Sequence, residues 1–366
     1  MSKPINPSLL NSRTLMAEID KSNVLGSIEA LTKQVKHAWD SVQSIKFTPQ
    51  AEIRNVVVAG MGGSGLGADV IKTLYKEQLT VPFDFVHDYT LPGYINQHSL
   101  VVLASYSGTT EEVLACAGEA QAKQAQIMVI CAGGTLAELA AQKGYTAYII
   151  DPVYNPSNQP RMAIGYAVFG TLGLLAKANV IQLSDAQVQE VIATIAQTLE
   201  QNRVEVDQAQ AQAKMLAFAI LDRRPVLVVA DFLEGAAHVS NNQFNENAKI
   251  YCDYKIVPEI DHHLLEGLSH PSSNVSTHLF VFVNSSLYHP SNQLRMNLSQ
   301  QAVSKHGLET SSLELTSQSR LTQVFELITV LGLANFYLAM LEKIDPAPIP
   351  TVDWFKVELK KLTATK

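Results

Sequence analysis

The sequence is poor in charged residues and in cysteine. Only 17% of its 366 residues are charged, and 27 Lys and Arg against 34 Asp and Glu leave a net charge of −7. This negative sign argues against nucleic acid or an anionic membrane as the main partner. The three cysteines, Cys116, Cys131 and Cys252, form no CxxC pair, which is typical of reduced thiols in a cytoplasmic protein. No catalytic role is predicted for them.

Long apolar runs are also missing. The longest uncharged runs, 162–176 and 327–341, each contain glycine and are shorter than the roughly 18 apolar residues of a membrane span. We expect both runs to be buried helices. The first residues, MSKPINPSLLNSR, contain no apolar core after the first basic residue and do not predict a secretory signal. We therefore expect a cytoplasmic protein with no membrane partner.

What the sequence does contain is two series of short apolar runs alternating with helical stretches. The first series is NVVVAG, VPFDFVH, LVVLASYS, QIMVICAG and TAYIID, and the second is PVLVVAD, KIVPEI, HLFVFVN and a shorter run near 310–315. Continuous apolar runs of this length are typical of parallel strands covered by helices on both faces. The pattern predicts an α/β fold with two parallel sheets flanked by helices.

The length of the chain also favours two units, because a single hydrophobic core stops growing at roughly 250 to 300 residues. An apolar stripe over 23–45 predicts a packing helix within an N-terminal helical segment, 1–50. We expect a first α/β unit at 51–183, a linker helix at 184–222, and a second unit with C-terminal helices at 223–366.

A glycine loop, Gly60-Met61-Gly62-Gly63-Ser64-Gly65, follows the first apolar run and matches G-x-G-x-x-G. Asp88 follows the next run, where a dinucleotide-binding fold places its ribose-binding acid. The loop is therefore compatible with NAD, with a turn that binds nothing, or with another anion. What the glycines supply in each case is exposed N–H groups at the start of a helix.

A second loop favours a phosphate monoester. The segment SYSGTTE, 105–111, places four hydroxyl side chains and free backbone donors around one turn before a helix. Such a turn forms a cup for a terminal phosphate, whereas a pyrophosphate needs no second cup. The alternative is a helix cap over 109–112, although a cap needs only one hydroxyl.

Together, GMGGSG and SYSGTTEE resemble the phosphate-binding half of a sugar isomerase (SIS) domain. Three further pieces follow in order: Pro160-Arg161 with Tyr166, FNENAK at 244–249, and PEIDHH at 258–263. The series resembles the bifunctional phosphoglucose/phosphomannose isomerase family over roughly residues 50–360. The resemblance implies two SIS-type, flavodoxin-like doubly wound subdomains, of which the first binds phosphate.

The resemblance also implies an activity and a set of site residues. The activity is the aldose–ketose isomerisation of hexose 6-phosphates, in which glucose 6-phosphate and/or mannose 6-phosphate is converted to fructose 6-phosphate through an enediolate. Glu246 corresponds to the proton-shuttling base and Arg161 to the residue that stabilises the enediolate. His262, donated by the neighbouring subunit, and Lys356 correspond to the ring-opening residues, with Lys360 one turn away as the alternative lysine. The implied phosphate-binding residues are Gly63, Ser64, Ser105, Ser107 and Thr110.

Further implications are a homodimer with shared active sites, no cofactor, and a place in glycolysis, gluconeogenesis and carbohydrate metabolism. Two segments depart from the family pattern. The chain has DHHL at 261–264 where the family reads Asn-His-Asn-Glu, and VSN at 239–241 where the family carries a basic pair. These departures leave open a non-catalytic sugar-phosphate sensor or an isomerase of another sugar phosphate. The glycine loop separately leaves open an NAD-dependent oxidoreductase. Acidic and histidine residues at 259–266 match no metal-binding motif, so we expect no metal.

Overall fold

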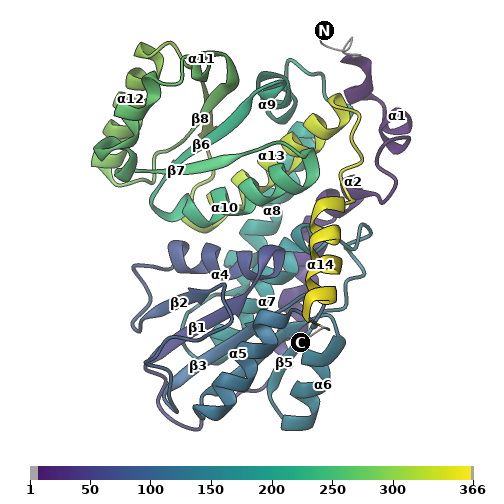
Figure 1. Cartoon of the computed structure of the whole chain (residues 1–366), viewed down its shortest axis with the longest axis vertical. Coiled ribbons are helices and arrows are strands. Elements are labelled where there is room, and N and C mark those ends of the chain that lie inside the picture. Colours follow the sequence, from purple (N-terminus) through teal and green to yellow (C-terminus); the bar gives the residue numbers. More distant parts are fainter. Residues whose placement is uncertain (1–6, 364–366) are drawn as a thin grey trace.

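The computed structural model describes residues 7–363, which form two α/β halves stacked one on the other (Figure 1). Residues 1–6 and 364–366, at the ends of the expected N-terminal segment and second unit, lie outside the described residues. Each half contains one parallel sheet with helices on both faces, so the predicted fold class is confirmed.

The first sheet has five parallel strands in the order β2-β1-β3-β4-β5. They are β1 (Asn55–Gly60), β2 (Phe83–Val86), β3 (Ser99–Ala104), β4 (Gln126–Cys131) and β5 (Thr146–Ile149). Every residue of β3 and β4 is buried, as expected for apolar strands covered on both faces. One face packs against α4 (Gly62–Leu74) and α7 (Ile164–Lys177), and the other against α5 (Glu111–Ala122) and α6 (Gly134–Lys143).

The second sheet has four parallel strands in the order β7-β6-β8-β9. They are β6 (Arg224–Ala230), β7 (Asp253–Val257), β8 (His278–Ser285) and β9 (Glu309–Leu315). The expected KIVPEI strand ends at Val257, because Pro258 has no N–H to donate to the ladder. The long helices of this half are α10 (Glu234–Gln243), α12 (Pro290–Lys305) and α13 (Arg320–Leu341).

The N-terminal and linking segments are helical. The helix expected over 23–45 is two helices, α2 (Val24–Glu29) and α3 (Leu31–Gln43), since the backbone leaves helical dihedrals at Ala30. The linking segment forms α8 (Asp185–Asn202) and α9 (Gln212–Ile220). The remaining elements are short or terminal: η1 (Pro7–Asn11), α1 (Arg13–Ala17), η2 (Pro160–Met162), η3 (Asp231–Leu233), η4 (Phe244–Ala248), η5 (Glu259–His262), η6 (Leu264–Ser269), α11 (Asn274–Thr277) and α14 (Pro350–Thr363).

One continuous core joins the two halves. Helix α13 is long and apolar enough to cross a membrane, but 94% of its most apolar window is buried inside the protein, as in a core helix. The rings of Phe169 on α7 and Phe325 on α13 lie 5.2 Å apart. A Cβ at Gly235 would lie 2.5 Å from the Cα of Val70, so α10 and α4 are in backbone contact. The halves are therefore held in a fixed orientation by tight packing.

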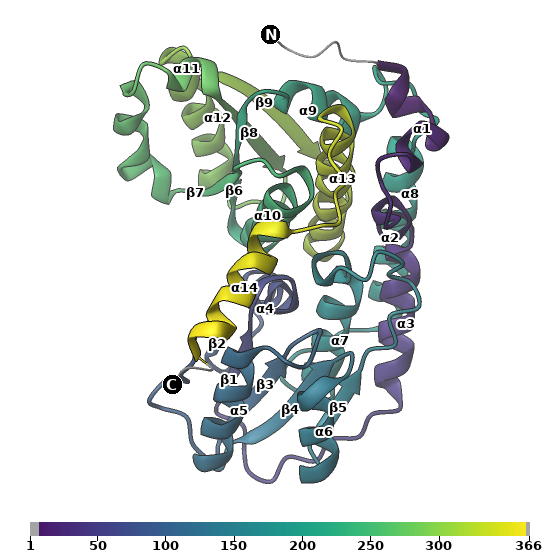
Figure 2. The same cartoon turned by 45° about the vertical axis from the view of Figure 1, so that its right-hand side comes forward.

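Helix α14 stands apart from this core. Figures 1 and 2 both show it (yellow) leaving the second half and running down to the level of the first sheet. None of its described residues is buried, and Trp354 and Phe355 are 62% and 59% exposed.

Candidate active site

The two predicted phosphate-binding loops emerge side by side. Strands β1 and β3 are neighbours, with Gly60 opposite Ala104, and the glycine loop (60–65) and the hydroxyl loop (105–110) follow their carboxyl ends. The chain crosses from β1 to β2 on one side and then to β3 on the other. The crevice between β1 and β3 is thus the topological switch point, where open α/β sheets bind their ligands.

Close backbone approach explains the glycine loop. A Cβ at Gly63 would lie 2.6 Å from the backbone nitrogen of Arg161, and one at Gly65 would lie 2.9 Å from the oxygen of Gly60. Gly62 has a φ of +48°, a left-handed conformation that L side chains rarely adopt. The loop therefore brings the start of α4 against the segment that carries Arg161.

The hydroxyl loop has a buried part and an exposed part. Ser105 is 1% exposed, and its hydroxyl lies 2.8 Å from that of Thr110 and accepts a hydrogen bond from the Gly108 N–H at 3.1 Å. Ser107 and Thr109 are exposed, with their hydroxyls 3.1 Å apart. Thr110 is the N-cap of α5, but its side chain makes no capping hydrogen bond. The hydroxyls are therefore not used to cap the helix, contrary to the alternative interpretation.

Ser64 connects the two loops, because its hydroxyl accepts a hydrogen bond from the Tyr106 N–H at 2.8 Å. The predicted phosphate-binding residues therefore share one edge of the sheet: Gly63, Ser64, Ser105, Ser107 and Thr110. Two helix N-termini with exposed hydroxyls between them suit a phosphate group.

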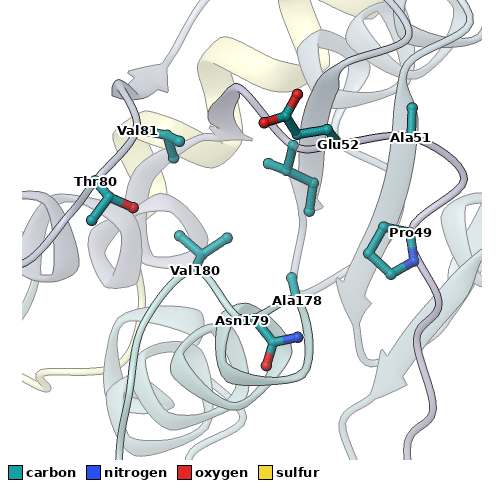
Figure 3. Close-up of a pocket in the computed structure, with 9 residues that line it drawn as sticks. Pro49, Ala51, Glu52, Thr80, Val81, Ala178, Asn179 and Val180 are labelled. Atoms are coloured by element: carbon teal, nitrogen blue, oxygen red, sulfur yellow. The ribbon is translucent and has the colours of Figure 1, made fainter.

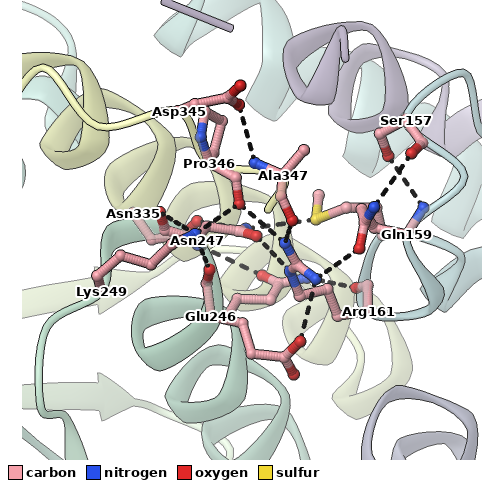
Figure 4. A network of polar contacts seen from close by, with 12 residues as sticks. Ser157, Gln159, Arg161, Glu246, Asn247, Lys249, Asn335, Asp345, Pro346 and Ala347 are labelled. Carbon is pink, nitrogen blue, oxygen red and sulfur yellow. Dashed lines mark hydrogen bonds and ion pairs between the residues drawn. The ribbon is translucent and has the colours of Figure 1, made fainter. Parts of the chain in front are cut away.

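Arg161 lies behind this edge and is 1% exposed (Figure 4). Its Nε donates to Asn247 Oδ1 at 2.5 Å, and its Nη1 donates to Gln159 Oε1 at 2.9 Å and to Glu246 Oε2 at 3.0 Å. Its Nη2 donates to the carbonyls of Pro346 and Ala347, both at 2.8 Å. All five guanidinium N–H donors are therefore engaged. Burial lowers the pKa of Arg161, while the charge of Glu246 acts in the opposite direction.

Glu246 lies in η4, a π-helical turn that continues α10. Its side chain is 27% exposed, and within residues 7–363 no group donates a hydrogen bond to its Oε1. Asn247 anchors the turn, since its Nδ2 donates to Asn335 Oδ1 on α13 at 2.8 Å. The result is a carboxylate with one oxygen fixed by Arg161 and the other open to a substrate.

Glu246 and His262 flank opposite ends of β7 along the chain. Glu246 precedes the strand and His262 follows it, and the first and last Cα atoms of this five-residue strand lie about 13 Å apart at 3.3 Å per step. The neighbouring Asp261 faces α12, where it accepts hydrogen bonds from Arg295 at 2.9 Å and Ser299 at 2.6 Å. This contact fixes η5 on α12 and leaves His262 exposed.

Lys356 and Lys360 both lie on the exposed helix α14. The hydrogen bonds of Arg161 and Glu246 include neither lysine. The structure thus brings together the phosphate loops, Arg161 and Glu246, and leaves His262 and both lysines outside this group.

Sequence reasoning missed the partners of Arg161. It also missed Lys249, which shares the Pro346 carbonyl with Arg161: its Nζ donates to that carbonyl at 3.0 Å and to the carbonyl of Glu246 at 2.5 Å. Burial, and then the charge of Arg161, lower the pKa of Lys249 to about 8. Asn247 and Lys249 lie within the FNENAK motif, which could have indicated them from the sequence. No sequence motif indicated Gln159 or the carbonyls of Pro346 and Ala347.

A separate pocket lies at the opposite edge of the first sheet (Figure 3), where 49–53 and 80–81 precede strands and 178–180 follow α7. Its lining contains a carboxylate, Glu52, and the residues that follow the C-terminus of α7, where a helix carries partial negative charge, so it does not suit a phosphate. Among the described residues, no group of three or more His, Cys, Asp and Glu could hold a metal ion.

Two family models match the chain. The SIS domain matches residues 51–153, and the bacterial phospho-glucose isomerase C-terminal SIS domain matches residues 209–359. The chain is 29% identical over 339 residues to a bifunctional phosphoglucose/phosphomannose isomerase of Caldicellulosiruptor bescii, covering 92% of this chain and 98% of that protein. A protein of the same name from Aquifex aeolicus is 29% identical over 325 residues, covering 88% and 94% of the two chains.

A hypothetical protein from Thermus thermophilus has a similar structure. Its TM-score is 0.74 at 16% sequence identity, and the match covers 98% of this chain and 94% of that one. At this identity the likeness shows the fold.

Proposed function

The chain belongs to the bifunctional phosphoglucose/phosphomannose isomerase family, and on that premise we propose that it isomerises hexose 6-phosphates with Glu246 as the proton-transferring base. The substrate would be glucose 6-phosphate and/or mannose 6-phosphate, and the product fructose 6-phosphate. The observation that carries the proposal is the contact between Arg161 and Glu246 beside the phosphate cup.

In this proposal the cup holds the phosphate through Ser64, Ser107, Thr110 and the N–H groups that follow Gly63. Ser105, which is buried, supports the loop from behind. The open-chain sugar then extends toward Glu246. Oε1 removes the proton from C2 of the aldose, the C2–H electrons form the C1–C2 double bond, and the C1=O1 π electrons move onto O1 to give the enediolate. Return of the proton to C1, with transfer of the hydroxyl proton from O2 to O1, gives the ketose.

In this scheme the Arg161 guanidinium is paired with one negative charge at every stage of the reaction. Before proton transfer this charge is on Glu246, and afterwards it is on the enediolate. Because all five donors are engaged, an enediolate oxygen must replace an existing acceptor of Nη1. We propose that protonated Glu246 releases Nη1, which then donates to the enediolate.

His262 would act in the site of a second copy. Its position at the far end of β7 and its exposure support a homodimer with shared active sites. Exposed apolar side chains on α12 and α14, Leu294, Leu298, Trp354 and Phe355, are further support, since such residues are common in interfaces. Lys356, from α14, would assist ring opening. The proposal includes no cofactor and places the reaction in the cytoplasm, within central carbohydrate metabolism.

The test is an NMR time course of the pure protein with a panel of hexose 6-phosphates and ketose phosphates. We expect conversion by the wild type and a loss of at least about 10³-fold in kcat for Glu246→Gln, which has no base. Folded Glu246→Gln with full turnover of fructose 6-phosphate would overturn the assignment of the base.

The same panel tests the sensor alternative, which the DHHL departure motivates. A thermal shift of the wild type with glucose 6-phosphate, without isomerisation of any sugar in the panel, would favour a binding protein.

A further inference from the structure

The linker between α13 and α14, residues 342–349, passes directly behind the candidate site. Pro346 and Ala347 are buried, whereas Pro348 and Pro350 are exposed. The buried pair is therefore the last point at which the chain is fixed to the protein body before α14 begins.

Two cations hold that point (Figure 4). Arg161 Nη2 donates to the carbonyls of Pro346 and Ala347, and Lys249 Nζ donates to the same Pro346 carbonyl. Within the linker itself, the Ala347 N–H donates to Asp345 Oδ1 at 3.1 Å. Buried carbonyls bound by charged donors form strong hydrogen bonds, so the position of the linker is well defined.

The linker is also stiff. Its sequence DPAPIP contains Pro346, Pro348 and Pro350, each of which fixes its own φ and restricts the residue before it. Only Pro348 and Ile349 lie between the anchor and Pro350, the first residue of α14. Because α14 buries none of its own described residues, its direction is set mainly by this attachment.

Lys249 is not placed to bind a substrate. Its Nζ has three N–H donors, and they face the carbonyls of Glu246 at 2.5 Å, Pro346 at 3.0 Å and Asn247 at 3.5 Å. The charged groups around it are Arg161, Asp345 and Glu246. Lys249 thus connects the backbone of the base to the linker.

We propose that Lys249 is a positioning residue that, with Arg161, clamps the Pro346 carbonyl and thereby orients α14 and Lys356 relative to Glu246. In this arrangement one guanidinium and one ammonium group control both the base and the helix that carries the ring-opening lysine. The inference rests on the proposed function for the role of Lys356, but the clamp itself is tested without turnover.

The first test follows the motion of α14 directly. Trp354 lies on α14, and the only other tryptophan, Trp39, is buried and donates to Asp185. Time-resolved fluorescence anisotropy, with Trp354→Phe as the blank for Trp39, reports the local motion of the helix. Lys249→Met is compared with Lys255→Met, a lysine of the same half that pairs with Asp253 on β7.

We expect Lys249→Met to add a fast component to the Trp354 decay and Lys255→Met to leave the decay unchanged. An unchanged decay in folded Lys249→Met would overturn the clamp. If Lys249→Met does not fold, Pro348→Gly loosens the linker at an exposed position, and it should give the same fast component. An unchanged decay in Pro348→Gly would count equally against the inference.

The second test is a kinetic double-mutant cycle with Lys356. Lys249→Met should lower kcat about tenfold with KM changed less than about twofold, because the phosphate cup is intact. In a Lys356→Met background, Lys249→Met should lower kcat less than about twofold, because the lysine that Lys249 positions is no longer present. If the kcat losses of the two single variants multiply in the double variant, Lys249 does not act through Lys356. A wild type without isomerase activity would refute the proposed function, and the anisotropy result would still decide whether the clamp exists.

Discussion

Arg161 and Glu246 come from different halves of the chain, yet Nη1 of the arginine lies 3.0 Å from Oε2 of the glutamate. The arginine follows the last strand of the first sheet, and the glutamate follows α10 of the second half. Tight packing of α4 on α10 and of α7 on α13 brings the two side chains together. The candidate site therefore exists only when both halves are folded and docked.

Because the site depends on contacts between the two halves, we expect Arg161 to contribute to the stability of the fold as well as to the reaction. Arg161→Met would leave the Asn247 oxygen and the Ala347 carbonyl without their donor, and would leave Glu246 unpaired. The Pro346 carbonyl would keep only its hydrogen bond from Lys249. We expect a loss of about 3–5 kcal/mol in the free energy of unfolding, measured by urea denaturation. Arg161→Lys keeps the charge but lacks the planar set of five donors, so it should recover only part of the loss. A fully stable Arg161→Met would contradict the anchoring role.

Two serines of the hydroxyl loop allow an effect on substrate binding to be distinguished from an effect on stability. Ser107 is exposed and Ser105 is buried with two hydrogen-bond partners. Ser107→Ala should raise KM for fructose 6-phosphate about tenfold and leave the melting temperature unchanged, because it removes one donor to the phosphate. Ser105→Ala should instead cost about 1–3 kcal/mol of stability. Steady-state kinetics and urea denaturation on both proteins decide this, and a reversed pattern would mean that Ser105 is the phosphate contact.

The apolar runs and the two loops could be interpreted from the sequence because they are local. Strand β3, for example, is six consecutive buried residues followed at once by Ser105, so pattern and position agree. The neighbours of Arg161 could not be predicted in this way. Pro346 lies 185 residues further along the chain and contributes only a backbone carbonyl, which leaves no side-chain signal in the sequence.

Two further features of the structure are not shown by any local pattern. Asp261 stands next to His262 in the sequence, but its carboxylate is held by Arg295 on α12. The apolar stripe over 23–45 is real, but the helix breaks at Ala30. Periodicity predicts which face of a helix is buried, and it does not report a one-residue interruption.

The position of His262 gives a test of shared sites. If His262 serves the partner's Glu246, then Glu246→Gln and His262→Ala proteins are each inactive as homodimers. A heterodimer of the two has one site with both residues intact. An equimolar mixture after subunit exchange should therefore reach about one quarter of wild-type activity, since half of the dimers are mixed and each has one working site. A mixture as inactive as its components, with exchange verified by mass spectrometry, would place His262 outside a shared site.

Lys249 gives a pH dependence with a definite sign. Burial lowers its pKa from 10.5 in the unfolded chain to about 8 in the folded protein. Between these values the unfolded state binds the proton and the folded state does not, so this residue makes the protein more stable as the pH rises from 8 to 10.5. Below pH 8 both states are protonated, and the full cost of burying the charge is present.

The measurement is the free energy of urea unfolding for the wild type and for Lys249→Met at pH 7.5, 9 and 10.5. Burial also lowers the pKa of Lys214 to about 8, but both proteins contain that lysine, so its contribution cancels in the difference. We expect the difference to move in favour of the wild type at each step up in pH, because methionine has no proton to lose. A constant difference would mean that the ammonium group keeps its charge in the folded protein, held by the three carbonyls around it.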